Sequence, residues 1–303
     1  MARKAYKKTG KSVAEIVTEK ILIMLEQGEI PWQKPWACLG GMPKSFAGRE
    51  YRGINVLLLA LSARQGPFIT AYMVKKLKGK IKEGEEDNWT LITFFKILKK
   101  ERKNSAGQNE KYSIPLMRYT KVYSLDQVEG VPEPAWLIKE RSKVEVKAHT
   151  PIQACDALWD AYASKPPMSH GGDRAFYSPS EDRIGMPTPE AFTSSEAYYS
   201  TLFHEATHST GHTSRLGRFD TKQAVAPFGS EDYSKEELVA EIGSSMLSAH
   251  AGIECQDVQK NSVAYIQNWV KRIKADPDLI VKAAGQAQKA VDHILGTTFE
   301  TRD

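Results

Sequence analysis

The spacing of hydrophobic and polar positions predicts both helices and strands in the first half of the chain. Residues 12–27 repeat apolar side chains with the period of an amphipathic helix, and residues 56–63 form a nearly continuous apolar run typical of a buried helix. Residues 89–98 alternate as a strand does, and residues 115–128 predict the strand that returns after the polar stretch 99–112. This half therefore predicts a mixed α/β domain.

Two helices dominate the pattern of the second half. Residues 201–212 (TLFHEATHSTGH) and residues 234–247 (SKEELVAEIGSSML) place apolar side chains at helical spacing. Ser234 and Glu237 predict a capping-box start for the second of these helices. Together with the strands of the first half, these helices favour the α+β fold class.

The length of 303 residues is typical of two domains. We expect one domain in residues 1–135 and a second in residues 136–303. The stretch EGVPEPAW (129–136) is rich in proline and acid, which predicts a stiff connector and two separable domains.

Charge divides the chain in the same way. The net charge is +5, but residues 1–150 hold 28 Lys and Arg against 16 Asp and Glu, a balance of +12, whereas residues 151–303 have a balance of −7. A basic half favours a polyanionic partner, most often a nucleic acid, although a lysine-rich soluble domain has the same composition.

Candidate chemistry begins with His204 and His208, which lie one helical turn apart and so share a face. Two imidazoles placed in this way can bind the same Zn²⁺ ion, with each nitrogen about 2.0–2.1 Å from the metal. Glu205 would project beside the metal, where it can accept a proton from water. The H-E-x-x-H pattern fixes only three positions, so a helix with two satisfied histidines stays open as the alternative.

A catalytic zinc also needs a third protein ligand. A third histidine in the extended H-E-x-x-H pattern would fall at Ser214, which cannot replace it. His212 would lie about 12 Å from His204 along a continuous helix, so only a sharp turn at Gly211 would let it bind. Glu237 and Glu241, which share a helical face, offer a carboxylate ligand and a second carboxylate behind it. Taken alone, these two glutamates are better explained as a solvated acidic first turn, which also suits the helix dipole.

Aromatic residues alternate with basic residues in the first half. Trp32, Lys34 and Trp36 occur in a proline-bracketed stretch, and Arg49, Tyr51 and Arg52 precede a glycine. Further lysines lie near the end of the predicted strand 89–98 and just after it, at Lys96, Lys99 and Lys100. Bases of single-stranded DNA stack on aromatic rings while lysine and arginine contact the phosphates, so these nine residues are candidate DNA contacts. Packing of the tryptophans in the core is the competing interpretation.

Longer motifs point to a known family. LEQGEIPWQKPW, YRGINVLLLA and VYSLDQVEG in the first half, with FTSSEAYYSTLFHEATHSTGHTSRLGR and EELVAEIGSSML in the second, resemble ArdC-type antirestriction proteins. The likeness covers about residues 12–300. It implies a single-stranded-DNA-binding domain, then a zincin-like metallopeptidase domain, in a protein that protects incoming plasmid DNA from host restriction. The first domain also resembles the start of some plasmid DNA primases.

The resemblance implies roles for individual residues. His204, His208 and Glu237 would bind one divalent metal, most simply Zn²⁺, and Glu241 would support a ligating histidine. Glu205 would be the general base, and Tyr233, just before the glutamate helix, could reach an oxyanion. The strand RIGMP (183–187), flanked by Tyr177 and Asp182, would be an edge strand that pairs with an extended peptide substrate.

Two main hypotheses of function remain open. The first is a DNA-tethered metalloprotease that acts on an unidentified protein, such as a restriction component. The second is a non-catalytic protein that coats single-stranded DNA and keeps a structural or vestigial metal site. A metal-dependent nuclease is less well supported, because the carboxylate-rich cluster of a paired-metal site is not evident.

The chain has no apolar run of about 18 residues, so we expect no transmembrane helix and no membrane partner. Cys38, Cys155 and Cys255 are far apart and form neither a zinc knuckle nor a disulfide framework. A reducing, cytoplasmic setting is therefore expected.

Overall fold

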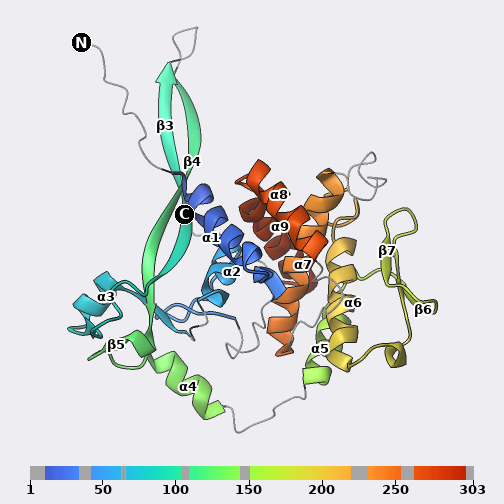
Figure 1. Ribbon diagram of the computed structural model, residues 1–303, viewed down its shortest axis with the longest axis horizontal. Coiled ribbons are helices and arrows are strands. Elements are labelled where there is room, and N and C mark those ends of the chain that lie inside the picture. Colours follow the sequence, from blue (N-terminus) through green and yellow to red (C-terminus); the bar gives the residue numbers. More distant parts are fainter. Residues whose placement is uncertain are drawn as a thin grey trace.

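The computed structural model describes residues 11–33, 42–62, 64, 66–103, 109–143, 151–219, 231–253 and 263–297. Helices and strands both occur, as the sequence predicts for the α+β class (Figure 1). In chain order the first half contains α1 (Val13–Glu26), η1 (Pro31–Gln33), α2 (Ile54–Ala60), β1 (Phe68–Thr70), α3 (Ala71–Lys76), β2 (Lys80–Ile81), β3 (Thr90–Lys103), β4 (Asn109–Ser124), η3 (Leu125–Gln127) and β5 (Val128–Glu129).

The second half contains α4 (Ala135–Lys143), α5 (Pro151–Ala161), β6 (Met168–His170), β7 (Phe176–Ser178), β8 (Arg183–Met186), η4 (Pro189–Ala191), α6 (Ser195–Ser209), α7 (Glu231–Ala251), α8 (Val263–Ala275) and α9 (Leu279–Ile294). None of the helices within the described ranges has the length and apolar content needed to cross a membrane. Helix α7 begins three residues before Ser234, so the predicted capping-box start at Ser234 is wrong.

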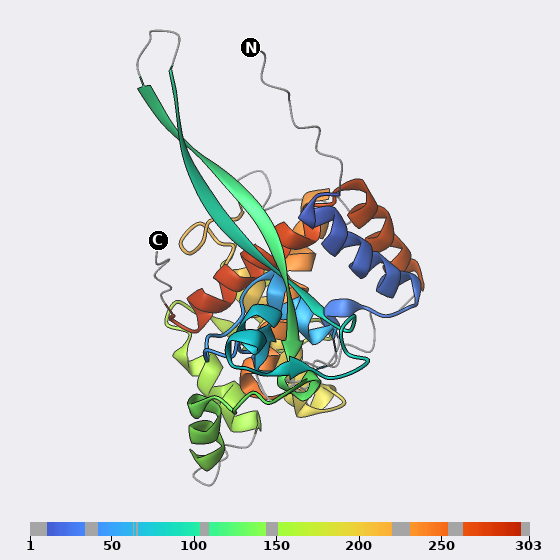
Figure 2. The same cartoon turned by 90° about the vertical axis from the view of Figure 1, so that its left-hand side faces the viewer.

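The first half is built around the long antiparallel pair of β3 and β4. The register runs from Thr90 opposite Val122 to Lys103 opposite Asn109, and β1 adds a third strand beside β4. The outer part of this pair projects beyond the helices as an arm, which both views show clearly (Figures 1 and 2). We call residues 90–124 the β3–β4 arm.

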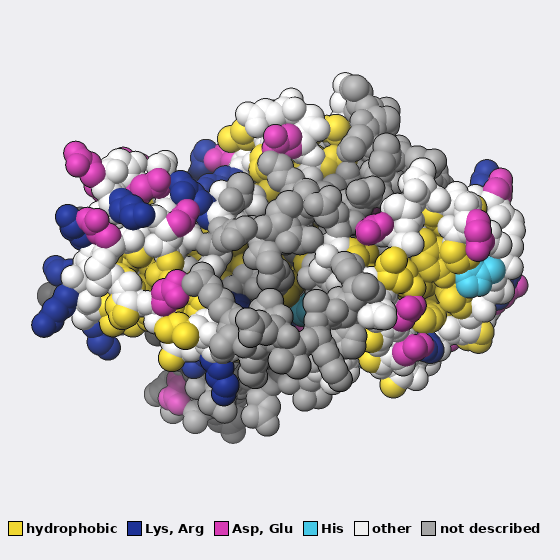
Figure 3. Space-filling model, turned by 90° about the horizontal axis from the view of Figure 1, so that it is seen from below, with side chains coloured by type: hydrophobic (Ala, Val, Ile, Leu, Met, Phe, Trp, Pro, Cys, Tyr) yellow, Lys and Arg dark blue, Asp and Glu magenta, His cyan; other side chains and the backbone are white. Residues whose placement is uncertain are grey.

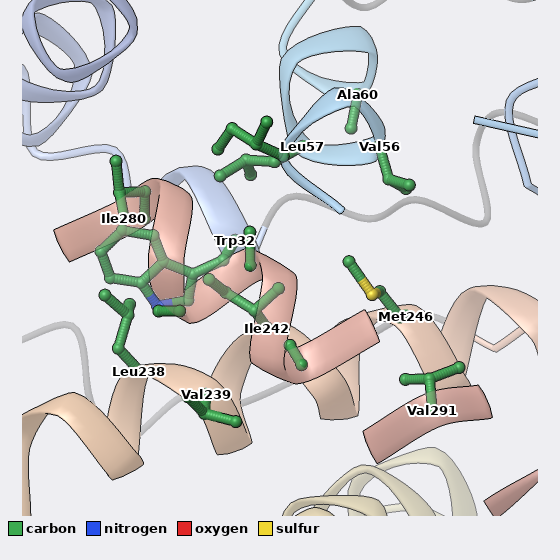
Figure 4. Packing of buried hydrophobic residues seen from close by; sticks show 14 of the residues in the cluster. Trp32, Val56, Leu57, Ala60, Leu238, Val239, Ile242, Met246, Ile280 and Val291 are labelled. Carbon is green, nitrogen blue, oxygen red and sulfur yellow. The ribbon is translucent and has the colours of Figure 1, made fainter. Parts of the chain in front are cut away.

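One hydrophobic core joins the two halves. The ring of Trp32, on η1, is fully buried and meets Trp269 of α8 edge to face at 5.6 Å. Figure 4 shows Trp32 among side chains from α2, α7 and α9, which include Leu57, Ile242 and Ile280. Burial of these apolar surfaces stabilises the first half only in the presence of the second. The described residues therefore argue against the separability that the sequence predicts for the two domains.

A separate three-stranded sheet of short strands lies beside α6. Its strand order is β6-β8-β7, with β8 parallel to β6 and antiparallel to β7. The sequence predicts that RIGMP (183–187) is an edge strand, and this is wrong. Strand β8 has a neighbour on each side, so its backbone hydrogen bonds are taken, and the outer strands of this sheet are β6 and β7.

Candidate metal centre

Helix α6 carries the two histidines and the glutamate of the H-E-x-x-H motif. The Ser194 hydroxyl caps the helix by accepting a hydrogen bond from the backbone N–H of Ala197. One turn apart, the rings of His204 and His208 meet at 80° with their centroids 4.7 Å apart. Their Nε2 atoms lie 3.0 Å from each other, so both rings present the same nitrogen to one point.

Helix α7 brings Glu237 to that point. Its carboxylate oxygens lie 3.7 Å from His204 Nε2 and 3.4 Å from His208 Nε2. One donor atom from each of the three residues falls within 4.8 Å of the others. The side chains of His204 and Glu237 are 13% and 23% exposed, so the cluster is only partly buried.

A glycine allows α7 to pack closely on α6. A Cβ atom added at Gly243 would lie 2.5 Å from Thr207 Cγ2, closer than side-chain contacts come. Any larger residue at position 243 would therefore move the two helices apart. The absence of a side chain there is one reason why Glu237 can reach the histidines of the facing helix.

The electrostatics of the cluster favour a cation. Burial lowers the pKa of the His208 ring, but hydrogen bonds to Glu236 and Glu237 and the nearby negative charges outweigh it and raise that pKa to about 10. Two imidazole nitrogens and a carboxylate are the donors that a divalent metal such as Zn²⁺ prefers. The residues present therefore fit a metal at this point.

Sequence reasoning missed Glu236 and Arg218. Glu236 Oε1 lies 3.4 Å from His208 Nδ1, and Arg218 binds the Glu236 carboxylate through Nε and Nη2 at 3.0 and 2.7 Å. Burial raises the pKa of Glu236, but hydrogen bonds from His208 and Arg218 and their positive charges lower it by more. The net pKa lies below its usual value, so the carboxyl group is ionised. No sequence signal marks Arg218, because it follows α6 in an irregular segment.

The other candidates of the sequence analysis lie close by. Glu205 and Glu241 are buried, with 8% and 4% of their surface exposed, and both are placed on the two helices that form the cluster. Tyr233 lies within the first turn of α7 and not before it, and the orientation of its side chain is outside the description. The roles of these three residues stay predictions.

His212 faces away from the metal cluster. Its Nδ1 lies 2.7 Å from Ser214 Oγ and 3.7 Å from an oxygen of Asp182. Asp182 also accepts from Arg215 and from the Tyr177 hydroxyl, the latter at 2.8 Å. Tyr177 and Asp182, predicted to flank a peptide-binding strand, thus belong to a polar network that fastens β7 and the β7–β8 turn to the end of α6.

Two candidate DNA contacts have other partners. Trp32 is fully buried, so its predicted stacking on a base is wrong: the ring cannot reach a ligand without unfolding the core. The Arg52 guanidinium forms an ion pair with Asp292 of α9, and the backbone N–H of Gly53 donates to Gln288 at 2.9 Å. The YRG stretch therefore fastens the first half to α9.

The remaining candidate DNA contacts lie in different surroundings. Burial raises the pKa of Tyr51 to about 12, and its ring packs edge to face on Phe68, whereas Arg49 is exposed. Lys34 and Trp36 lie outside the described residues. The backbones of Lys96, Lys99 and Lys100 lie in β3, but their side chains are outside the description.

These features define a class of protein: a chain with a β-ribbon-bearing N-terminal half joined to a helical half that carries an H-E-x-x-H cluster. Residues 154–286 match a zincin-like metallopeptidase family, and residues 11–123 match the N-terminal domain of the anti-restriction factor ArdC. The chain belongs to the ArdC antirestriction family, as the resemblance in the sequence predicts.

Solved structures of ArdC from plasmid R388 have the same fold over most of the chain. The metal-free form is 32% identical, with a TM-score of 0.71 over 95% of this chain and 100% of that one. The Mn(II)-bound form is 33% identical, with a TM-score of 0.72 over 94% and 98%. The zincin-like domain and the metal-bound relative support a divalent metal as the cofactor.

Curated relatives include two forms of DNA primase TraC of Escherichia coli, 32% and 33% identical over 93% of this chain. This chain spans only 20% and 27% of their lengths. An uncharacterized protein of Sinorhizobium fredii, y4eC, is 28% identical over 94% of this chain and 92% of its own length.

Proposed function

We propose that this chain is a single-stranded-DNA-binding antirestriction protein whose zincin-like site hydrolyses a peptide bond in a protein substrate. The observation that carries the proposal is the convergence of His204, His208 and Glu237 on one point, with Glu205 on the same helix as the histidines. The antirestriction protein of plasmid R388, similar over nearly the whole chain, supports the biological role. The natural setting would be the cytoplasm, where incoming DNA meets restriction enzymes.

The chemistry follows from residues of the two helices that form the cluster. His204, His208 and Glu237 would hold the metal, for which Zn²⁺ suits the donor set best. When bound, the metal supplies positive charge that acidifies water and polarises a carbonyl group. Glu205 accepts the proton of the attacking water and later returns it to the leaving amine. Glu241 remains a candidate for supporting a ligating histidine, and Tyr233 for stabilising the oxyanion.

Glu205 separates this proposal from a non-catalytic DNA-coating protein, because a structural metal site has no use for a base between its histidines. We would compare wild type with Glu205→Gln, which keeps the size of the side chain and removes the base. We expect unchanged metal content and DNA affinity but loss of protection against restriction during plasmid transfer. Full protection by Glu205→Gln would reject proteolysis as the protective activity and favour the coating protein.

For the DNA-binding surface we propose the β3–β4 arm. Residues 90–124 hold eight Lys and Arg against two Glu, and the outer part of the arm projects beyond the helices (Figure 2). Phe94 and Tyr119 are 44% and 46% exposed, and exposed Arg118 lies opposite Phe94 in the register. Aromatic rings beside cations suit single-stranded DNA, whose bases stack and whose phosphates attract arginine.

A rival surface lies at α3, where Tyr72 is 73% exposed one turn from Lys75 and Lys76. Figure 3 shows that Lys and Arg gather at this end of the molecule, but acidic side chains are interspersed among them. The acidic run at 83–87 offsets the lysines, so the arm is favoured.

Fluorescence anisotropy with an oligonucleotide separates the two surfaces. Phe94→Ala with Tyr119→Ala should weaken binding by about 1–3 kcal/mol for each stacked base that is lost. Tyr72→Ala is the matched control and should bind as wild type does. The reverse result would place the DNA on α3, and binding that ignores salt would argue against phosphate contacts altogether.

A further inference from the structure

The imidazole ring of His208 lies between two consecutive glutamates of α7. Glu236 Oε1 is 3.4 Å from the ring nitrogen Nδ1, and Glu237 Oε1 is 3.4 Å from the other nitrogen, Nε2. Only Nε2 also faces His204, at 3.0 Å. The two nitrogens therefore have different environments, one beside the carboxylate of Glu236 and one at the point where the three candidate ligands meet.

Arg218 fixes the glutamate on the Nδ1 side. Its guanidinium binds both oxygens of Glu236, and it also donates to Thr210 Oγ1 at 2.7 Å and to the Thr207 carbonyl at 3.0 Å. The side chains of Arg218 and Glu236 are only 10% and 16% exposed. A forked contact of this kind orients a carboxylate more strictly than a single hydrogen bond does. Glu236 is thereby held against the last turn of α6, where His208 lies.

An ionised carboxylate only accepts hydrogen bonds. Glu236 in this position accepts the hydrogen on Nδ1 of His208, so Nε2 is the ring nitrogen that is left for a metal. Nε2 faces Glu237 and His204, and a metal bound there would replace any hydrogen on Nε2. A histidine that lacks this restraint could place its hydrogen on Nε2 and would then be unable to donate electrons to a metal through that atom.

We propose that Arg218 and Glu236 are positioning residues that hold His208 in the tautomer and orientation needed to bind a metal through Nε2. The proposal rests on the metal site of the proposed function and assigns to Glu236, not to Glu241, the support of His208. Arg218 acts through Glu236, so its contribution exists only while that carboxylate is present.

The chain contains its own control for a purely structural ion pair. Arg215 binds Asp182 in a similar way, with its side chain 4% exposed, and Asp182 lies 3.7 Å from His212 Nδ1. In both places an arginine binds a carboxylate that lies beside a histidine, but here the histidine is outside the metal cluster. Loss of Asp182 should disturb packing to a similar extent without affecting the metal.

The test measures Zn²⁺ affinity of the full chain by competition with a chromophoric chelator at fixed pH. Glu236→Ala should lower affinity about 10–100-fold. Glu236→Gln, which keeps an acceptor oxygen and the packing, should lose less. Arg218→Gln should weaken binding in the wild-type chain but have no further effect when added to Glu236→Ala. Asp182→Asn should stay within about twofold of wild type.

The measured affinities can overturn the positioning role or the metal site itself. Equal affinities of Glu236→Ala and Asp182→Asn would overturn the proposal, and so would an Arg218→Gln effect that persists without Glu236. Melting temperatures of the metal-free variants identify any that are unfolded, and Glu236→Gln then serves in place of Glu236→Ala. His204→Ala tests the metal site itself: if it keeps wild-type affinity, the proposed function fails, whereas loss of binding there with no effect at Glu236 rejects only the positioning role.

Discussion

Short motifs predict both the metal cluster and the N-terminal DNA contacts. The structure brings the metal-cluster residues together, whereas it places Trp32 and Arg52 in internal contacts. His204 and His208 meet because four residues make about one helical turn, a relation that holds wherever the helix lies. Trp32 and Arg52 share a composition typical of DNA contacts, but the former is in the core and the latter pairs with Asp292. Spacing within one helix fixes geometry, whereas residue type alone does not fix exposure.

The largest expected effect concerns Trp32. Trp32→Ala should lower the free energy of unfolding by about 3–5 kcal/mol, because it empties space between η1, α7 and α8. If the ring contacted DNA instead, the variant would keep its stability and lose affinity. Urea unfolding followed by both tryptophan fluorescence and circular dichroism measures the change and should show a single transition. Two separate transitions, with only one shifted, would restore the prediction of separable domains.

The next effect distinguishes Glu237 from Glu241, both on α7. Glu237→Ala should weaken Zn²⁺ binding by at least about 100-fold, or roughly 2.8 kcal/mol, since it removes a donor atom from the cluster. Glu241→Ala should retain most of the affinity. The measurement is metal content after dialysis together with chelator competition. Loss of metal in Glu241→Ala but not in Glu237→Ala would show that the two roles are reversed.

The glutamates also show where sequence reasoning reaches its limit. The helical phase of residues 234–247 makes Glu237 a candidate ligand. The neighbouring Glu236 lies about 100° away around the helix, and the pattern does not predict its contacts with His208 and Arg218. The position of β8 was missed for a similar reason, because the order of strands in a sheet depends on partners far along the chain. The family, indicated by long motifs, and the α+β class, indicated by the hydrophobic periods of helices and strands, were predicted correctly.

A smaller effect is expected at Arg52, where the comparison between DNA contact and internal contact is most direct. Arg52→Ala should cost about 1 kcal/mol of stability, since it breaks a partly exposed ion pair with Asp292. The affinity for single-stranded DNA should change by less than about twofold, which is below 0.5 kcal/mol. Arg118→Ala on the β3–β4 arm is the matched variant, and it should keep the stability of wild type and weaken the affinity for single-stranded DNA. If a double-mutant cycle of Arg52 and Asp292 gives no coupling energy, their ion pair does not contribute to stability and this prediction is wrong.

The smallest effect sharpens the contrast between the two arginine–carboxylate pairs near α6. Burial raises the pKa of Asp182, but hydrogen bonds from Arg215 and Tyr177 and the nearby charges outweigh it and hold that pKa below its ordinary value of 3.8. A carboxyl group with a lowered folded pKa adds stability that is fully present above the ordinary value and is lost as the pH falls toward the folded value.

Asp182→Asn removes this contribution. The melting temperature of wild type should therefore exceed that of the variant by a constant amount from about pH 7 to about pH 5, and the difference should shrink below about pH 4. Loss of metal at low pH affects both proteins alike, because neither Asp182 nor Arg215 contacts the cluster of His204, His208 and Glu237. A difference that stays constant down to about pH 2.5 would mean that packing, and not the charge of Asp182, fastens the β7–β8 turn to the end of α6.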